Sequence, residues 1–497
     1  MKPGSLFLEA LRLDREPWEV VLRRAENALA LDVAGFLLFG GSVERVPGLI
    51  AELRRKADRP LWFAADLERG AGQQFRGAAD LPPPGALARH PRAEETARWA
   101  GAATARQARA LGVNWVLAPV LDLDVEAANP IVGTRSFGAD PVRVGCLGKA
   151  WVNGCQEAGV AACAKHFPGH GRTLSDSHIG LPLVSASRAE LEDDVAPFRA
   201  VAGLVAGIMT AHVAYPGLEA EGAATFSPSV LTGLLRRELG FPGLILSDAM
   251  VMSGFRLGRL SEGDLAARAI AAGCDLLLYP RDLALAVEGL AAALERDPSL
   301  ARRADDARRR NLHWCVRFEA RGAAGPAAGG GTAPEPAGRA LRIALECMRE
   351  VGDVPVGGWS RERNTRVSCL LEDALPASAR TFGARLIREL RALGWKRIAS
   401  APVDAPDPED DGRRSSTAVQ RLLMVVSTPR AGKSVAGLTS DTLRRVAVAL
   451  ERDPETCLFV FGHPRILRQI GARGVCAWSS EPLFERAAAR WLDERVG

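Results

Sequence analysis

The chain has 497 residues, of which 47% are hydrophobic and 25% are charged, a balance that excludes a disordered or a membrane-embedded protein. This length is greater than a domain with a single hydrophobic core usually has, so we expect two domains. The formal net charge of +5 comes largely from arginines spread along the chain, and no basic stretch is interleaved with aromatic residues, which argues against a nucleic-acid partner.

The N-terminal segment is amphipathic and carries Glu9 and Arg12. It has no uninterrupted apolar stretch, so we expect no signal peptide. No later apolar run approaches the ~20 residues needed to cross a bilayer, and we expect no membrane partner. The nine cysteines are scattered and include no Cys-x-x-Cys pair, which indicates reduced thiols rather than disulfides or a zinc site. These features together predict a cytoplasmic protein.

Short apolar runs alternate with helix-period segments up to about residue 319. This order is typical of an α/β fold built as a parallel (β/α)8 barrel, whose strands are covered on both faces. Seven runs qualify as strands: Gly35–Phe39, Leu61–Ala65, Val113–Leu117, Val160–Ala164, Gly207–Ala211, Leu244–Ser247 and Asp275–Leu278. Helices are predicted at Glu94–Leu111, Arg188–Ala202 and Leu231–Leu239. No eighth strand is visible in the pattern, but a TIM-like barrel over residues 1–320 remains the economical prediction.

A segment rich in Gly, Pro and Ala, residues 321–338, predicts a flexible linker. Beyond it, residues 339–497 predict a second, smaller α/β unit of the sandwich type. Its expected strands are Arg366–Leu371, Leu422–Ser427 and Leu458–Gly462, and its expected helices are Ala379–Leu393, Thr442–Leu450 and Pro482–Leu492.

Chemistry-bearing residues gather directly after the fourth predicted strand. The segment reads Lys165-His166-Phe167-Pro168-Gly169-His170-Gly171 and, after four intervening residues, continues with Asp176-Ser177-His178. Three histidines and an Asp-x-His pair within so short a segment are not typical of a buried hydrophobic core. Because α/β folds build their sites at the carboxyl ends of strands, we expect this segment to line a functional site.

A single carboxylate, Asp248, follows another apolar strand, Leu244–Ser247. A barrel presents a nucleophile to its open face at this position. Taken alone, the same Asp would also suit the N-cap of the next helix.

Both segments resemble the signatures of glycoside hydrolase family 3, in its β-N-acetylhexosaminidase branch. The first resembles the Lys-His-Phe-Pro-Gly-His-Gly…Asp-x-His motif, and the stretch from Phe241 to Asp248 resembles the motif that ends on the nucleophilic Asp. The likeness is strong between about Leu61 and Phe255 and weak in the C-terminal part, which resembles a shortened form of the family's sandwich domain.

The resemblance implies a role for each matching residue. Asp248 would form the glycosyl-enzyme ester, and His178, paired with Asp176, would be the general acid and base in place of the usual second carboxylate. The residues expected to bind the sugar are Asp66, Arg135, Lys165 and His166. A helix cap at Asp66 and a salt-bridged loop position for Arg135 are the alternatives. No metal or organic cofactor is implied.

Two positions depart from the family pattern. Arg69 stands where the family usually has Gly, and Gln74 replaces an Arg, so one charged contact to the sugar is lost unless Arg76 supplies it. These departures leave the identity of the bound sugar open.

The leading prediction is a retaining exo-β-N-acetylglucosaminidase that acts on a small carbohydrate substrate in cell-wall fragment recycling. A β-glycoside phosphorylase is the first alternative, because a neutral His tolerates a phosphate acceptor that a carboxylate would repel. The second is a non-catalytic sugar-binding relative, which would lack Asp248 or His178. The sequence does not indicate the aglycone or the oligomeric state.

Overall fold

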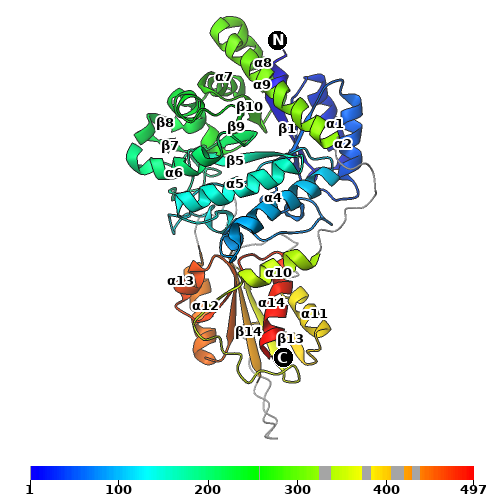
Figure 1. Ribbon diagram of the computed structural model, residues 1–497, viewed down its shortest axis with the longest axis vertical. Helices are drawn as coiled ribbons and strands as arrows, with labels where there is room; N and C mark the ends of the chain where they lie inside the picture. The colour runs from blue at the N-terminus through cyan, green and yellow to red at the C-terminus, as the bar shows by residue number, and fades with distance from the viewer. Residues whose placement is uncertain are drawn as a thin grey trace.

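This computed structural model describes residues 2–256, 258–323, 337–371, 382–403, 419–427 and 437–496. The first part of the chain is a closed barrel with the strand order β1-β10-β9-β6-β5-β4-β3-β2, in which every neighbouring pair is parallel. Helices surround it, and the last part of the chain forms a separate sheet below it (Figure 1). The predicted α/β fold class, a TIM-like barrel followed by a smaller α/β unit, is therefore confirmed.

The barrel strands are β1 (Phe7–Arg12), β2 (Gly35–Phe39), β3 (Trp62–Ala65), β4 (Trp115–Val116), β5 (Ala161–Phe167), β6 (Gly207–Thr210), β9 (Leu244–Ala249) and β10 (Leu276–Leu278). The helices around them are α1 (Trp18–Ala30), α2 (Val46–Lys56), α3 (Pro84–Leu87), α4 (Ala93–Ala110), α5 (Pro141–Glu157), α6 (Arg188–Val201), α7 (Glu262–Ala272), α8 (Leu283–Arg296), α9 (Pro298–Ala323) and the π-helical η6 (Ser229–Glu238). A short hairpin of β7 (Ala214–Tyr215) and β8 (Ala220–Ala223) follows β6. Short 3-10 turns complete the barrel: η1 (Pro3–Leu6), η2 (Ala71–Gln73), η3 (Gly133–Arg135), η4 (Pro216–Leu218), η5 (Ala224–Phe226) and η7 (Ser253–Phe255).

The strand that the sequence pattern did not reveal is β1, at the very start of the chain. It pairs with β2 on one side and β10 on the other, and so closes the barrel. Because β1 contains the charged residues Glu9 and Arg12, its sequence is not a continuous apolar run and does not read as a buried strand. Glu9 is buried and forms an ion pair of 3.1 Å with Arg24 of α1, while Arg12 pairs with Asp14 at the strand end.

Large side chains fill the inside of the barrel. The rings of Trp62 and Trp115 lie 4.2 Å apart between their centroids, and both are fully buried. Trp314 and Phe318 of α9 pack against this inner cluster, and Trp62 donates a hydrogen bond of 2.7 Å to Asn311 of the same helix. The barrel is thus a packed core that α9 covers near the amino ends of its strands.

The C-terminal part contains a six-stranded sheet in the order β11-β16-β15-β14-β12-β13, parallel except for β11. Its strands are β11 (Arg349–Val351), β12 (Thr365–Leu371), β13 (Ile398–Ser400), β14 (Gln420–Ser427), β15 (Cys457–Gly462) and β16 (Gly474–Cys476). Its helices are α10 (Ala337–Cys347), α11 (Ala384–Ala392), α12 (Ser440–Arg452), α13 (Arg465–Ile470) and α14 (Pro482–Val496). Figure 1 shows α12 and α13 on one side of the sheet and α10, α11 and α14 on the other, which is a sandwich.

Some predicted boundaries need correction. The expected linker at 321–338 is helical at both ends, because α9 runs to Ala323 and α10 begins at Ala337, where alanines favour a helix. Its remaining residues lie outside the described ones, as do the first residues of the helix expected at Ala379–Leu393. The short strands β11, β13 and β16 were not predicted, because three residues carry too little periodicity to be recognised.

Candidate active site

The residues predicted to carry chemistry lie at the carboxyl ends of β3, β5 and β9 and in the loops that follow β4 and β5. Asp66 follows β3, and Asp248 lies near the end of β9. Lys165 and His166 are part of β5 itself, which corrects the expectation that they belong to the loop behind it. In a parallel barrel these ends meet at one face, so the predicted site residues come together there.

A buried ion-pair network connects the loop after β3 with β5 and η3. The Nζ atom of Lys165 lies 2.6 Å from Oδ1 of Asp66 and 2.8 Å from Oε1 of Glu68. Arg135 holds the same Glu68 with two hydrogen bonds, of 2.9 Å from Nε and 2.8 Å from Nη2. The pKa of Glu68 lies well below its usual value, because these two cations outweigh the effect of burial. Glu68 therefore fixes Lys165 and Arg135 in one geometry.

Asp122, in the loop after β4, is the anchor of the histidine segment. Its carboxylate is fully buried and accepts hydrogen bonds from the His166 and His170 backbone N–H groups, at 3.1 and 2.7 Å. Its Oδ2 atom lies 2.7 Å from Nδ1 of the His166 ring. Burial would raise the pKa of Asp122, but the two histidines lower it to about 2. With Nδ1 held by Asp122, the His166 ring has Nε2 left to meet a substrate.

Asp176 and His178 form the predicted pair in the loop after β5. The Nδ1 atom of His178 lies 2.7 Å from Oδ1 of Asp176, and the His178 backbone N–H donates to the same oxygen at 2.8 Å. Asp176 is completely buried, whereas the His178 side chain is 43% exposed. Burial would lower the pKa of His178, but the hydrogen bond to Asp176 and the charges of Asp176 and Asp248 raise it.

The pKa of Asp248 is shifted in the opposite direction from that of His178. Burial alone would raise the pKa of its carboxyl group, but the nearby His166 and His212 rings and the Ala249 backbone N–H, which donates to Oδ1 at 2.7 Å, bring it below the usual value. The pKa of Asp248 is therefore lowered, whereas the pKa of His178 is raised. Groups whose environments push their protonation states apart are typical of acid–base sites.

The loop after β5 contains two glycines, Gly169 and Gly171, at positions where a larger residue would not fit. Gly169 has a φ of 140°, and a Cβ atom there would lie 2.8 Å from Cβ of Asp194. A Cβ on Gly171 would lie 2.1 Å from the backbone oxygen of Leu123. Glycine therefore lets this segment pass close to α6 at residue 169 and close to the loop after β4 at residue 171.

Four site residues were given no role from the sequence: Glu68, Asp122, His212 and His170, although His170 belongs to the segment expected to line the site. Asp122 and Glu68 each lie a few residues after a predicted barrel strand, and this position alone could have marked them as candidate site residues. His170 and His212 are fully buried, with Nδ1 of His170 2.8 Å from Thr173 Oγ1 and Nδ1 of His212 2.8 Å from Thr225 Oγ1. Their roles depend on tertiary partners, which a single sequence does not reveal.

The two departures from the family pattern have structural consequences. Arg69 reaches across to the C-terminal part and forms an ion pair of 2.5 Å with Glu481. The Gln74 side chain accepts a hydrogen bond of 3.3 Å from the Gly40 backbone N–H, and Arg76 is exposed. Within the described residues, the ion pairs of the site are made by Arg135 and Lys165, and Arg76 takes part in none of them.

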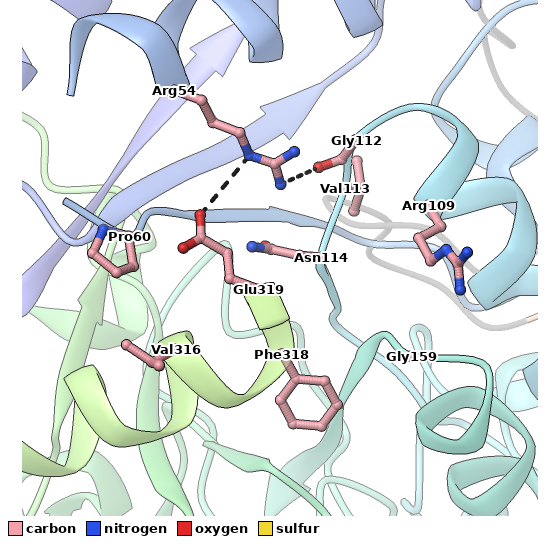
Figure 2. A pocket seen from close by; sticks show the side chains of 10 residues that line it. All are labelled: Arg54, Pro60, Arg109, Gly112, Val113, Asn114, Gly159, Val316, Phe318 and Glu319. Atoms are coloured by element: carbon pink, nitrogen blue, oxygen red, sulfur yellow. Dashed lines mark hydrogen bonds and ion pairs between the residues drawn. The ribbon is translucent and has the colours of Figure 1, made fainter. Parts of the chain in front are cut away.

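A cavity of about 520 Å³ lies at the opposite end of the barrel from the candidate site (Figure 2). Pro60, Asn114 and Gly159 line it, and each precedes a barrel strand. Its only ion pair drawn in Figure 2 joins Arg54 and Glu319 at 4.0 Å. This cavity is at the amino ends of the strands, away from the site residues.

None of the described helices has the length and apolar character needed to cross a membrane, and no described group of three or more His, Cys, Asp or Glu side chains is placed to hold a metal.

Comparison with known proteins gives a consistent result. Residues 20–313 match the family profile described as "Glycosyl hydrolase family 3 N terminal domain". A "Beta-hexosaminidase" from Pseudomonas aeruginosa is 40% identical over 269 residues, which are 52% of this chain and 79% of that protein. A "Beta-N-acetylglucosaminidase/beta-glucosidase" from Cellulomonas fimi is 33% identical over 360 residues, or 68% of this chain and 62% of that protein.

Solved structures match the whole chain. A glycoside hydrolase family 3 β-N-acetylglucosaminidase from Paenibacillus sp. str. FPU-7 superposes with a TM-score of 0.80 at 26% identity and covers 100% of this chain and 96% of its own. The β-glucoside phosphorylase BglX superposes with a TM-score of 0.82 at 21% identity, covering 100% of this chain and 91% of its own, and this likeness concerns the fold.

Proposed function

Because the chain belongs to glycosyl hydrolase family 3 and is a glycoside hydrolase, we propose that it releases terminal β-linked N-acetylglucosamine from small carbohydrates with retention of configuration. The observation that carries this proposal is that Asp248, near the end of β9, and the hydrogen-bonded pair of His178 and Asp176, in the loop after β5, lie at the same barrel face. The pKa of Asp248 is lowered and that of His178 is raised. Retaining glycosidases need such a nucleophile and such an acid.

In the first step, one carboxylate oxygen of Asp248 attacks the anomeric carbon while the bond to the leaving oxygen breaks. That oxygen takes the proton from Nε2 of His178, whose Nδ1 is held by Asp176. In the second step, the neutral His178 takes a proton from water, the water oxygen bonds to the anomeric carbon, and the carboxylate of Asp248 is released. Two displacements at one carbon give a product with the original configuration.

The remaining predicted residues would hold the sugar. Asp66, Arg135, Lys165 and His166 would offer donors and acceptors to ring hydroxyls. Glu68 holds Arg135 and Lys165 in place, Lys165 in turn holds Asp66, and Asp122 holds His166. The site carries more carboxylates than cations, which favours the positive charge that develops on the sugar ring in the transition state. We further propose a cytoplasmic role in the turnover of cell-wall fragments, with no metal or organic cofactor taking part.

A panel of aryl β-glycosides, assayed in phosphate and in phosphate-free buffer, tests this function. We expect a higher kcat/KM for the N-acetyl-β-glucosaminide than for the plain β-glucoside, because a pocket fitted to an acetamido group loses contacts with a hydroxyl. We also expect free sugar as the product in both buffers. A sugar 1-phosphate formed in phosphate buffer would instead identify the phosphorylase alternative, and a better plain glucoside would refute the proposed sugar.

A further inference from the structure

A cavity of about 630 Å³ lies between the barrel and the C-terminal sheet. The barrel contributes Arg89, Gly133 of η3, the segment from Ser136 to Asp140, and Arg143 of α5. The C-terminal part contributes Arg349 of β11, the segment from His463 to Arg468, and Trp478. A volume of this order suits a ligand of small-molecule size. None of the predicted catalytic or sugar-binding residues lines this cavity.

The lining is strongly basic. It contains five arginines and two carboxylates, and each carboxylate already accepts a hydrogen bond or forms an ion pair within the protein. Asp124 accepts from Arg465 at 2.5 Å and lies 3.0 Å from Nε2 of His463. Asp140 caps α5 by accepting from the Arg143 backbone N–H at 2.7 Å. The arginines in question are Arg89, Arg143, Arg349, Arg465 and Arg468.

Three of these guanidinium groups have no counter-ion within the described residues. Arg89, Arg349 and Arg468 form neither an ion pair nor a side-chain hydrogen bond there, although they come from separate parts of the chain. Burial and the like charges of Arg349, Arg143 and Arg468 lower the pKa of Arg89, so these cations repel one another across the cavity. Such repulsion is relieved when an anion enters between them.

We propose that this interdomain cavity is a binding site for a small phosphate monoester of about the size of a sugar phosphate. Planar guanidinium groups match the oxygens of a phosphate with paired hydrogen bonds, which lysines do not offer. The cavity leaves room for an organic group beside the phosphate, and Trp478 and Phe137 supply apolar surface in the lining. Because the ligand touches both parts of the chain, its binding would also hold them together.

Isothermal titration of the full chain with glucose 6-phosphate, inorganic phosphate and glucose tests this proposal. We expect glucose 6-phosphate to bind with a dissociation constant below about 1 mM and glucose not to bind. Inorganic phosphate reports how much of the affinity comes from the phosphate group alone. The triple variant Arg89→Gln, Arg349→Gln and Arg468→Gln should bind glucose 6-phosphate at least about tenfold more weakly.

Two control variants distinguish binding in this cavity from binding elsewhere on the protein. A triple variant at exposed arginines outside the cavity, Arg23→Gln, Arg55→Gln and Arg237→Gln, removes the same charge and should bind as the wild type does. His178→Ala changes the catalytic site and should also leave binding unchanged. Arg468→Glu, a single reversal of charge, provides a second test should the cavity triple variant fold poorly.

Three results would overturn the proposal. The first is equal binding by the wild type and the cavity triple variant. The second is loss of binding in His178→Ala, which would place the phosphate in the catalytic site. The third is the absence of any binding at millimolar ligand, which would mean that the arginines are simply solvated.

Discussion

At the scale of single residues, the proposed mechanism depends on His178 acting as the proton donor. For His178→Ala we expect kcat/KM on a disaccharide to fall by about 100- to 10,000-fold, because a poor leaving group needs its proton. The loss should be much smaller for glycosides of acidic phenols, and added azide should partly restore the second step. Steady-state kinetics over a series of phenols measures this, and equal losses across the series without rescue would make His178 structural.

The protonation of His178 also predicts a pH dependence. The free enzyme needs His178 protonated and Asp248 ionised, so the alkaline limb of kcat/KM reports the first group and the acid limb reports the second. Asp176 raises the pKa of His178 and so extends activity to higher pH. For Asp176→Asn we expect the alkaline limb to move to lower pH, with the acid limb in place. Asp193→Asn, at an exposed carboxylate on α6, is the matched control, and an unmoved alkaline limb in Asp176→Asn would contradict the pairing.

At the scale of elements, the loop after β5 is held by contacts away from the chemistry. His170 is buried and joins Thr173 to Ser177, with its Nε2 atom 3.2 Å from Ser177 Oγ, while Gly254 donates to the Ser177 backbone oxygen at 2.9 Å. These contacts place His178, the next residue.

Loss of His170 should therefore resemble a mild loss of His178. For His170→Ala we expect kcat/KM to fall about tenfold or more on a disaccharide and less on an activated aryl glycoside, because a displaced proton donor matters most for poor leaving groups. His313→Ala, at an exposed histidine on α9, should have no such effect. A uniform loss for His170→Ala on all substrates would argue for general destabilisation instead.

The same scale shows what a single sequence could and could not provide. The strand β2 was predicted with its observed bounds, and β3, β5 and β9 were predicted within a few residues, because they are continuous apolar runs. The strand β1 was not predicted because Glu9 interrupts its apolar run, and this buried carboxyl group is paired with Arg24, which lies on α1. All seven predicted site residues lie at one barrel face, because motif and strand end coincide. Glu68 and Asp122 act through their partners, and those partners lie far away in sequence.

At the scale of the whole molecule, Arg465 connects the C-terminal part to the barrel. Its side chain donates to Asp124 at 2.5 Å and to the backbone oxygens of Glu126 and Ala127 at 3.2 and 3.1 Å. For Arg465→Ala we expect the free energy of unfolding to fall by about 2 kcal/mol, as for other hydrogen bonds to charged groups. Urea unfolding measures it, with Arg444→Ala, which breaks an exposed pair on α12, as the control. Equal stability of the two variants would show that this contact does not hold the parts together.

The central claim, that Asp248 is the nucleophile of a retaining glycosidase, is tested most directly by trapping the glycosyl-enzyme. A fluorosugar inactivator of the N-acetylglucosamine series, followed by proteolysis and mass spectrometry, identifies the labelled residue. We expect one label, on the peptide that contains Asp248, and no label in Asp248→Asn. This variant should also retain less than about a hundredth of the wild-type activity, because no other group can form the ester. A label on Asp66 or Glu68, or unchanged labelling of Asp248→Asn, would contradict this claim.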